Sequence, residues 1–266
     1  MDEISRFALE IRKIILTQSK RAHVGHIGSA LSIADIVAVL YNRVLNIPSP
    51  KDAQRDRFIL SKGHAALALY AALYLRGGLS QAELNTYCGD GSLLGVHPEF
   101  ELPGIDFATG SLGLGLSIGV GAALAARLQG SRRRVFVLVS DAECNEGSLW
   151  EAVMSAAHFK LSNLIAIVDL NGQQALGTTG EVLDLSPMAS RWQAFNWDAC
   201  EVDGHDLAAI NTGIARFDLE HDRPHVLIAH TIAGKGVSFM EHQVKWHYMP
   251  LTDLEFQQAM LEVGQE

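Results

Sequence analysis

The sequence predicts an α/β fold with a mainly parallel sheet covered by helices on both faces. Residues 135–139 and 164–171 form two short, apolar, β-branched runs, which are typical of strands buried on both sides. Between them, apolar residues that include Leu149, Val153 and Ala157 recur at helical spacing. A strand, a helix and a second strand in one sheet form a unit whose two strands run parallel, and more alternation of strands and helices follows.

The first third of the chain is predicted to be helical around one short strand. Apolar residues at helical spacing indicate a helix that runs from Ile4 toward Ala22. We expect residues 23–29 to form a loop and a second helix to extend from about Ser32 to Tyr41. Residues 57–60 indicate a strand. Residues 61–64 then open a helix rich in alanine and leucine, which ends before two glycines at 77 and 78.

The middle of the chain combines an irregular segment with a glycine-rich helix. Residues 89–103 indicate a long loop, which in a compact domain is often functional. The run at 109–115 does not match G-x-G-x-x-G, so a dinucleotide site is not favoured. It leads into a helix that carries Gly115, Gly119 and Ala123 on one stripe. Because small residues let another helix approach closely, we expect this stripe to form a buried packing face or a subunit contact.

The last third is predicted to complete the sheet. Residues 198–202 and 226–231 indicate two further strands, joined by a helix that begins near Asp206. The pairs Ser80 with Glu83 and Thr252 with Glu255 each form a capping-box pattern, and the second pair marks the start of the final helix.

Composition limits the class of protein and its partners. The 266 residues are 48% hydrophobic and 19% charged, which suits a single domain spanning 1–266. The net charge of -9 argues against nucleic acid and against an anionic membrane surface as partners. The three cysteines form no C-x-x-C pattern, which favours reduced thiols and a cytoplasmic location. We interpret Cys144 as a small loop residue rather than a nucleophile.

Two polar residues, Asp141 and Asn171, follow the paired strands and are candidate metal ligands. Parallel strands place both residues at the carboxyl edge of the sheet, where open α/β sheets bind ligands. Carboxylate and amide oxygens suit Mg²⁺ or Ca²⁺, and the helix that starts near Ser148 directs its N-terminus to the same place. The alternative is that Asp141 caps a loop and Asn171 ends a strand, and spacing alone does not decide between the two interpretations.

Four of the eleven histidines, namely His26, His64, His97 and His247, lie in predicted loops near glycines. Each of them alone is more often a capping or surface residue. Together they indicate a group of imidazoles that faces the sheet edge, where neutral histidines can exchange protons near pH 7.

Several separated motifs resemble those of the transketolase family, and the resemblance covers essentially the whole chain. Residues 140–143 with Asn171 resemble the thiamine diphosphate signature Gly-Asp-Gly-Glu followed by Asn, although Ser140 and Ala142 stand where the family usually has glycines. The other matching motifs lie at residues 25–28, 61–65, 97–99, 109–113, 234–241 and 246–247. Ala233 stands where many relatives have a lysine near the substrate, which indicates an altered substrate.

The resemblance implies a thiamine diphosphate-binding fold, with Mg²⁺ or Ca²⁺ holding the cofactor. The implied metal ligands are Asp141, Asn171 and the backbone carbonyl of Gln173. The implied cofactor-binding residues are His64, Gly110, Leu112, Asp141, Ala142, Glu143, Asn171, Gln173 and His247.

The resemblance also implies the catalytic residues and the reaction. His26, His64, His97 and His247 would line the substrate channel and move protons during transfer of a two-carbon ketol unit between sugars or sugar phosphates. Glu146, with Glu151, matches acids that lie between the two cofactor sites of a dimer. Stabilisation of a helix N-terminus explains these two acids equally well.

Full-length transketolases contain a second, pyrimidine-binding domain that this sequence does not match. The resemblance therefore implies the N-terminal subunit of a split transketolase, which would pair with a C-terminal subunit in a complex containing two copies of each chain. Two other classes remain open. One is the α-subunit of a thiamine-dependent 2-oxo acid dehydrogenase, which lacks the motifs at 61–64 and 97–99. The other is a non-catalytic regulatory subunit, which only Ser140 and Ala142 support.

Overall fold

A five-stranded parallel sheet organises the protein in a computed structural model that describes residues 1–264. The strand order is β1-β2-β3-β7-β6, and each neighbouring pair is parallel, as the sequence predicts. In the register of the central pair, Ser140 of β2 lies opposite Asp169 of β3, so both strands end at the same edge. The strands are β1 (Arg57–Leu60), β2 (Val135–Ser140), β3 (Leu164–Leu170), β6 (Asp198–Asp203) and β7 (His225–His230), and a separate hairpin pairs β4 (Gln173–Gln174) with β5 (Gly177–Thr178).

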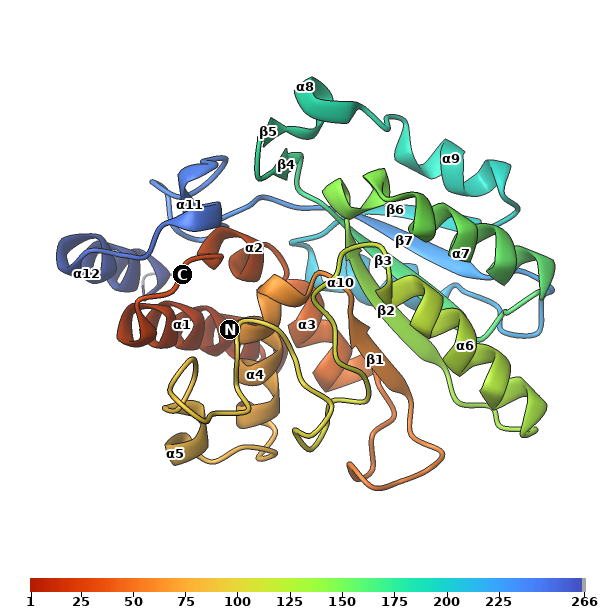
Figure 1. The fold of residues 1–266 in the computed structure, drawn as a ribbon, viewed down its shortest axis with the longest axis horizontal. Coiled ribbons are helices and arrows are strands. Elements are labelled where there is room, and N and C mark those ends of the chain that lie inside the picture. The colour runs from red at the N-terminus through yellow and green to blue at the C-terminus, as the bar shows by residue number, and fades with distance from the viewer. Residues whose placement is uncertain (265–266) are drawn as a thin grey trace.

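Helices cover both faces of the sheet and extend beyond its carboxyl edge (Figure 1). None of the described helices is both long and apolar enough to cross a bilayer. The helices are α1 (Glu3–Ala22), α2 (Ile27–Ser32), α3 (Ala34–Val39), α4 (Ala66–Leu75), α5 (Gln81–Leu84), α6 (Gly115–Leu128), α7 (Gly147–His158), α8 (Thr179–Leu183), α9 (Met188–Ala194), α10 (Leu207–Ala215), α11 (Lys245–Tyr248) and α12 (Asp253–Val263), with short turns of other pitch at η1 (Leu40–Val44), η2 (Gly63–Ala65) and η3 (Ala142–Asn145).

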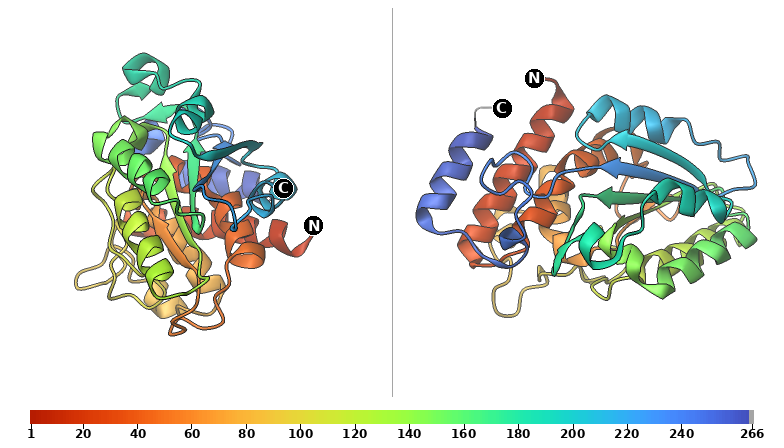
Figure 2. Two further views of the ribbon diagram at one scale, coloured as in Figure 1. Left: turned by 90° about the vertical axis from the view of Figure 1, so that its right-hand side faces the viewer. Right: turned by 90° about the horizontal axis from the view of Figure 1, so that it is seen from above.

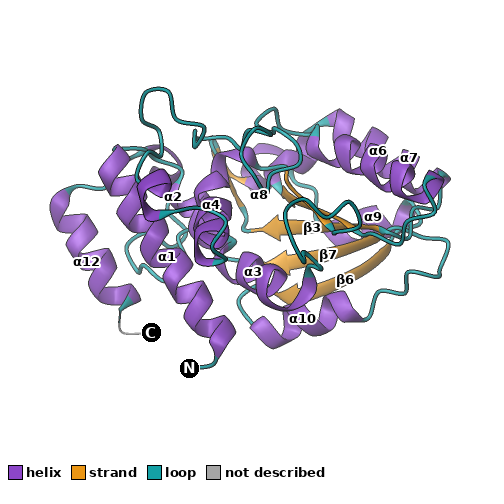
Figure 3. Cartoon of the chain, turned by 90° about the horizontal axis from the view of Figure 1, so that it is seen from below, coloured by secondary structure: helices purple, strands orange, loops and turns teal. Residues whose placement is uncertain are grey.

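The alternation of side chains along the strands builds two separate cores. In β2, Phe136 and Leu138 join the core that contains α1 to α4 and α10, whereas Val135, Val137 and Val139 join the core under α6, α7 and α9. Successive residues of a strand point to opposite faces, so an entirely apolar strand serves both cores. Figure 3 shows α3 and α10 on one side of the sheet and α6, α7 and α9 on the other.

A group of helices lies beyond the carboxyl ends of the strands. α1 packs against α3, α4 and α12, and α2 packs against α11, so the two ends of the chain meet in this group. Figure 2 shows α12, in blue, beside α1, in red, with the start of α1 and the end of α12 on the same side of the molecule. The sheet edge is therefore enclosed by helices from both ends of the sequence.

The second helix differs from the sequence expectation, which was a loop at 23–29 followed by one helix at 32–41. His26 adopts a left-handed conformation with φ of 60°, and α2 begins directly after it at Ile27. The helix breaks at Ile33, with φ of -102°, before α3 begins. Gly28 and Ser29 are helical because their tertiary contacts outweigh their weak helix propensity: Gly28 packs against Gly234 and Trp246, and Ser29 is buried beside His64.

The glycine stripe of α6 is buried as predicted, but it packs on the sheet and not on another helix. A methyl group added to Gly119 would lie 2.5 Å from Val137 Cγ2, and one added to Gly115 would lie 2.2 Å from Ser61 Oγ. These two glycines therefore bring the helix axis close to β1 and β2. The adjacent stripe, with Ser117 and Gly121, is exposed.

Candidate active site

A cavity of about 320 Å³ opens at the carboxyl edge of the sheet, where the sequence places the site. Ten of the predicted residues line it. The segments that supply them are far apart in sequence and come from the start of α2, the turn before α4, the loop before α6, the end of β2, the hairpin and α11. The predicted residues in the lining are His26, His64, His97, Gly110, Leu112, Ala142, Glu146, Asn171, Gln173 and His247.

Three of the histidines form a compact triangle. The ring centroids of His26, His64 and His247 lie 5.3 Å, 5.3 Å and 5.4 Å apart. His64 Nε2 lies 3.1 Å from Ser29 Oγ, and the backbone N–H of His26 donates to the carbonyl of His247 at 3.3 Å. His26 Nδ1 is buried and has no hydrogen-bond partner among the described residues. Such a buried nitrogen is left available for a ligand.

Burial keeps these histidines neutral at physiological pH. The pKa of His64 lies well below its usual value because burial and the positive charge of Lys62 both disfavour the imidazolium form. The pKa of His26 is lowered for the same reason, with His97 adding to the effect of burial, and burial lowers the pKa of His247 to about 4. A neutral imidazole can accept a proton from one atom and return it to another.

Asp141 and Asn171 lie next to each other at the ends of β2 and β3. Asp141 is only 2% exposed and accepts hydrogen bonds from the backbone N–H groups of Gly172 at 2.7 Å and Ala142 at 2.8 Å. Burial, and next the negative charge of Asp169, raise the pKa of Asp141 to about 7. A carboxylate in this position is stabilised when a cation binds beside it.

Glu143 lies behind the cavity wall and not in it. Its buried carboxylate accepts hydrogen bonds from the Ser61 hydroxyl, from the Gly113 N–H at 2.8 Å and from the Ser140 N–H at 3.2 Å. Burial raises the pKa of Glu143, and these donors oppose that increase. Glu143 thus ties the loop before α6 to the end of β2, and its direct contact with a cofactor remains a prediction.

The neighbouring Cys144 is buried, and its thiol donates to the Ser140 carbonyl at 3.3 Å. Burial raises the pKa of this thiol well above its usual value, which disfavours the thiolate that a nucleophile needs. These observations agree with the interpretation of Cys144 as a small structural residue, although it lies in the short helix η3 and not in a loop.

The outer wall of the cavity carries His97, Gly110 and Glu146. Gly110 has φ of 152°, and a methyl group on it would lie 3.0 Å from His97 Cγ, so a glycine is needed for the close approach of this loop. Glu146 is exposed and precedes α7, and its carboxylate makes no hydrogen bond or ion pair with the residues that the structure describes.

Sequence reasoning missed six cavity residues and one buried residue behind them. Lys62, Ser29, Gln174 and Ala175 are brought into the cavity by tertiary packing, and Asn145 contacts Gln174 at 3.3 Å. Ser140 was noted only as a departure from glycine, yet it also lines the cavity. The buried residue is Asp169, which ends an apolar strand. A charged residue in such a strand was the available signal.

The residues present fit a divalent cation that holds a diphosphate. One buried carboxylate, one amide oxygen and nearby backbone carbonyls form a hard, oxygen-only donor set, and the unpartnered His26 Nδ1 provides a polar contact for a ligand. Within residues 1–264 no group of three or more His, Cys, Asp or Glu side chains could hold a metal, so a site here depends on amide and backbone oxygens.

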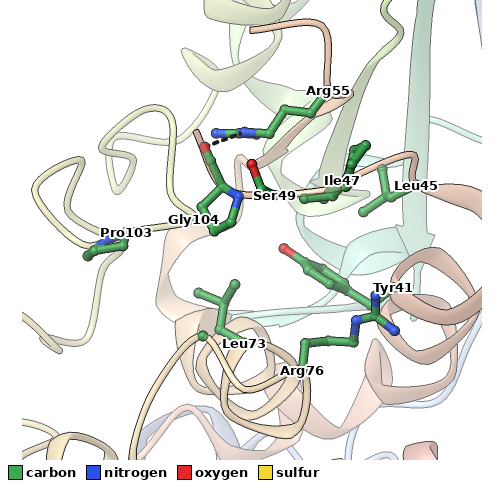
Figure 4. Close-up of a pocket in the computed structure, with 12 residues that line it drawn as sticks. Tyr41, Leu45, Ile47, Ser49, Arg55, Leu73, Arg76, Pro103 and Gly104 are labelled. Atoms are coloured by element: carbon green, nitrogen blue, oxygen red, sulfur yellow. Dashed lines mark hydrogen bonds between the residues drawn. The ribbon is translucent and has the colours of Figure 1, made fainter. Parts of the chain in front are cut away.

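A second cavity, of about 180 Å³, lies away from this site (Figure 4). Its walls are largely apolar, with Leu45, Ile47 and Leu73 among them. The guanidinium of Arg55 is held there by Asp106, with hydrogen bonds of 2.9 Å and 2.6 Å. Tyr41 and Arg76 also line this cavity, but no histidine or carboxylate is among its lining residues. We therefore place the chemistry of the protein in the histidine-lined cavity.

A parallel α/β sheet that ends in such a cavity defines a domain of the cofactor-binding class, and comparison with known proteins identifies its family. The family described as "Transketolase, thiamine diphosphate binding domain" matches residues 4–266. The chain belongs to this family, as the sequence motifs predict.

Similar chains have been described as subunits of transketolases. The chain is 41% identical over 256 residues to a protein of Phocaeicola vulgatus that is named as one of the subunits of an apulose-4-phosphate transketolase, covering 96% of this chain and 91% of that one. It is 38% identical over 259 residues to "6-deoxy-6-sulfo-D-fructose transketolase subunit SqwG" of a Clostridium species, covering 96% and 94%. These matches do not favour the alternative that the chain is the α-subunit of a 2-oxo acid dehydrogenase.

Solved transketolases share the fold. The crystal structure of transketolase from Campylobacter jejuni superposes with a TM-score of 0.93 at 30% identity, covering 99% of this chain but 43% of that chain. Transketolase from Leishmania mexicana gives a TM-score of 0.91 at 28% identity, with 42% of its chain covered. This chain therefore spans less than half the length of those enzymes.

Proposed function

We propose that residues 1–266 act as a single diphosphate-binding domain, and that this domain is one subunit of a two-chain transketolase. The observation that carries the proposal is the cavity in which three neutral histidines face Asn171 beside the buried Asp141. Transketolase relatives of similar length are named as subunits, which supports the need for a partner.

Thiamine diphosphate, when bound, supplies a nucleophilic carbon and an electron sink for breaking the bond next to a ketone. Asp141, Asn171 and the carbonyl of Gln173 would hold Mg²⁺ or Ca²⁺ against the diphosphate. The remaining cofactor contacts come from His64, Gly110, Leu112, Ala142, Glu143 and His247.

The histidines would then manage protons during transfer of a two-carbon ketol unit. His26, His64, His97 and His247 lie where a sugar chain would enter, and neutral rings can take a hydroxyl proton and return it. We infer a ketose or ketose phosphate donor and an aldose or aldose phosphate acceptor, the substrate class that the relatives' names indicate. The exposed Glu146, which lies in the outer wall of the cavity, would contact the second half of the active site.

The partner would be a C-terminal transketolase subunit that carries the pyrimidine-binding half, in a heterotetramer with two copies of each chain. We propose a cytoplasmic location for this complex, because the three cysteines are unpaired and free thiols persist in reducing compartments. Neither nucleic acid nor a membrane is required as a partner.

The test is an assay of ketol transfer from a xylulose phosphate to an aldose, with and without the candidate partner. We expect no turnover by the isolated chain and restored turnover with the partner, and substantial turnover by the chain alone would contradict the two-chain proposal. In the complex, Asp141→Ala should weaken Mg²⁺-dependent binding of thiamine diphosphate by about 100-fold or more. Loss of a residue that only hydrogen-bonds to a metal ligand typically costs about 10–100-fold in affinity, and loss of a ligand itself should cost at least as much. Unchanged affinity would contradict the metal assignment.

A further inference from the structure

Asp169 is a buried carboxylate in β3 that no catalytic or binding role explains so far. It is 0% exposed, and its Oδ2 accepts hydrogen bonds from Ser32 Oγ at 2.8 Å, Lys62 Nζ at 2.5 Å and Asn171 Nδ2 at 3.0 Å. Its Oδ1 accepts a further hydrogen bond from the Thr231 hydroxyl. Four side chains from four separate segments thus converge on one carboxylate.

The ion pair between Lys62 and Asp169 is almost completely removed from water. The side chains of Lys62 and Asp169 are 1% and 0% exposed. Desolvation of two charges offsets much of their attraction, so such a pair is weak evidence for added stability. Lys62 also donates to the Ser29 carbonyl at 3.1 Å, and Ser29 Oγ contacts His64, which connects the pair to the cavity wall.

The contact with Asp169 fixes the orientation of the Asn171 side-chain amide. An ionised carboxylate only accepts hydrogen bonds, so Asn171 must turn its Nδ2 toward Asp169. Its Oδ1 then faces the hairpin, where it accepts from the Gln173 N–H at 2.9 Å and keeps a second lone pair. The oxygen is the end of the amide that a hard cation requires.

The backbone of Asp169 also holds Asp141 in place at the end of β2. The Asp169 carbonyl accepts from the Asp141 N–H at 3.1 Å, so Asp141 is held at the strand end beside Asn171. Lys62 neutralises Asp169, which leaves Asp141 as the carboxylate that offers net negative charge to a cation.

We propose that Asp169 is a positioning residue for the cation site, which orients the Asn171 amide with its oxygen toward the cation, and that Lys62 is the counter-charge that allows a second carboxylate beside Asp141. The inference rests on the proposed cation site. It assigns to the buried pair a role in the geometry of binding that is separable from any effect on folding.

Two double variants separate the two effects. Lys62→Met/Asp169→Leu removes both charges and the acceptor for Asn171, whereas Lys62→Met/Asp169→Asn removes both charges but keeps an amide oxygen that can accept from Asn171 and an amide N–H₂ that can donate to Thr231. The measurement is Mg²⁺-dependent binding of thiamine diphosphate by titration calorimetry, with urea unfolding of each variant measured beside it. Both are made on the full chain in its complex with the partner.

We expect the leucine variant to need at least about tenfold more Mg²⁺ for half-saturation than the asparagine variant, within the range typical for loss of a partner that orients a metal ligand. Equal Mg²⁺ dependence in the two double variants would overturn the proposal, because both lack the ion pair in the same way. If the leucine variant does not fold, Lys62→Met/Asp169→Ala removes the same hydrogen-bond acceptor with a smaller side chain, and we expect the same result for it.

A second buried ion pair provides the matched control. Arg12 and Asp35 form hydrogen bonds of 3.0 Å and 2.6 Å outside the cavity lining, with His205 also bound to Asp35. Arg12→Met/Asp35→Asn should lower the free energy of unfolding and leave the Mg²⁺ dependence unchanged. An equal loss of Mg²⁺ affinity in this control would assign the effect to destabilisation and overturn the proposal. If the wild-type complex binds neither Mg²⁺ nor the cofactor, the proposed function itself fails, and that outcome is distinct from equal binding by the variants.

Discussion

Ala142 occupies a position where the family motif usually has glycine, yet its backbone does not require one. It is the first residue of η3, and neither Ala142 nor Ser140 has a positive φ. The alanine methyl therefore causes no backbone strain. This removes the conformational part of the argument for a degenerate, non-catalytic subunit.

Ala142→Gly should leave the affinity for thiamine diphosphate within about threefold and lower the free energy of unfolding by about 0.5–1 kcal/mol, since glycine loses more conformational freedom on folding. Calorimetric titration with the cofactor and Mg²⁺, together with urea unfolding, checks both values. A large gain in affinity would show that the methyl group crowds the diphosphate, and would favour the regulatory-subunit hypothesis.

The three clustered histidines predict a loss of stability in acid. Their folded-state pKa values lie below the unfolded value of 6.5, so the unfolded chain binds more protons as pH falls. Their contribution is fully present above pH 6.5 and is lost as pH falls toward about 4, the pKa of His247. The loss is at most about 1.4 kcal/mol per histidine for each pH unit, and less for a partly solvated ring.

Urea unfolding of the apo chain between pH 7 and pH 4.5 measures this dependence, and His247→Gln should reduce its slope. His221→Gln is the control, because His221 is exposed and bound only to Asp218 on the surface. An unchanged slope in the His247 variant would contradict the assignment of the effect to the cluster.

At the scale of a single element, α6 shows how small residues can serve opposite roles on one helix. Gly119 faces the sheet and is enclosed by Val137 and Leu164, whereas nothing lies within 4 Å of a methyl group placed on Gly121. The spacing of small residues in the sequence is the same on both stripes, so only packing distinguishes them.

Gly119→Ala should destabilise the protein by about 1–2 kcal/mol through overpacking, after the better helix propensity of alanine is included. Gly121→Ala on the same helix should instead stabilise it by up to about 1 kcal/mol. Equilibrium urea unfolding of the two variants measures the sign and size of each change in the free energy of unfolding. Equal effects would show that α6 does not seat on β2 as described.

At the scale of the whole molecule, the cavity opens beside a partly apolar surface. A groove of about 530 Å³ shares His97 and Gly110 with the cavity and is also lined by Leu114 and Ile118. Leu114 is 48% exposed at the start of α6, next to the exposed Ser117. We expect the partner subunit of the proposed two-chain enzyme to bind at this apolar surface, which lies at the mouth of the cavity.

Leu114→Arg should weaken assembly with the partner by at least about tenfold, because it places a charge in an apolar interface, and should leave the free energy of unfolding of the isolated chain within about 0.5 kcal/mol. Leu128→Arg is the matched control, since Leu128 is 78% exposed at the other end of the same helix. Sedimentation of the mixed subunits measures assembly. Equal assembly by both variants would place the partner elsewhere.

The sequence by itself determined the sheet, the long helices and most of the cavity residues. The apolar runs at β2 and β3 are buried on both faces, and strands of this kind must be parallel when a helix joins them, so the positions of Asp141 and Asn171 followed from local pattern. The resemblance to the family motifs placed the four histidines near the same edge of the sheet.

Only the tertiary structure decided which buried residues support the residues that line the cavity. Lys62 and Asp169 are 107 residues apart, and their contact depends on how the turn before α4 packs on β3, which no local pattern encodes. The same holds for α2, where burial by distant segments overrides weak helix propensity, and for the side of α6 that meets the sheet. Local sequence fixes periodicity and caps, whereas long-range packing decides which buried polar groups find partners, and that packing exists only in the folded chain.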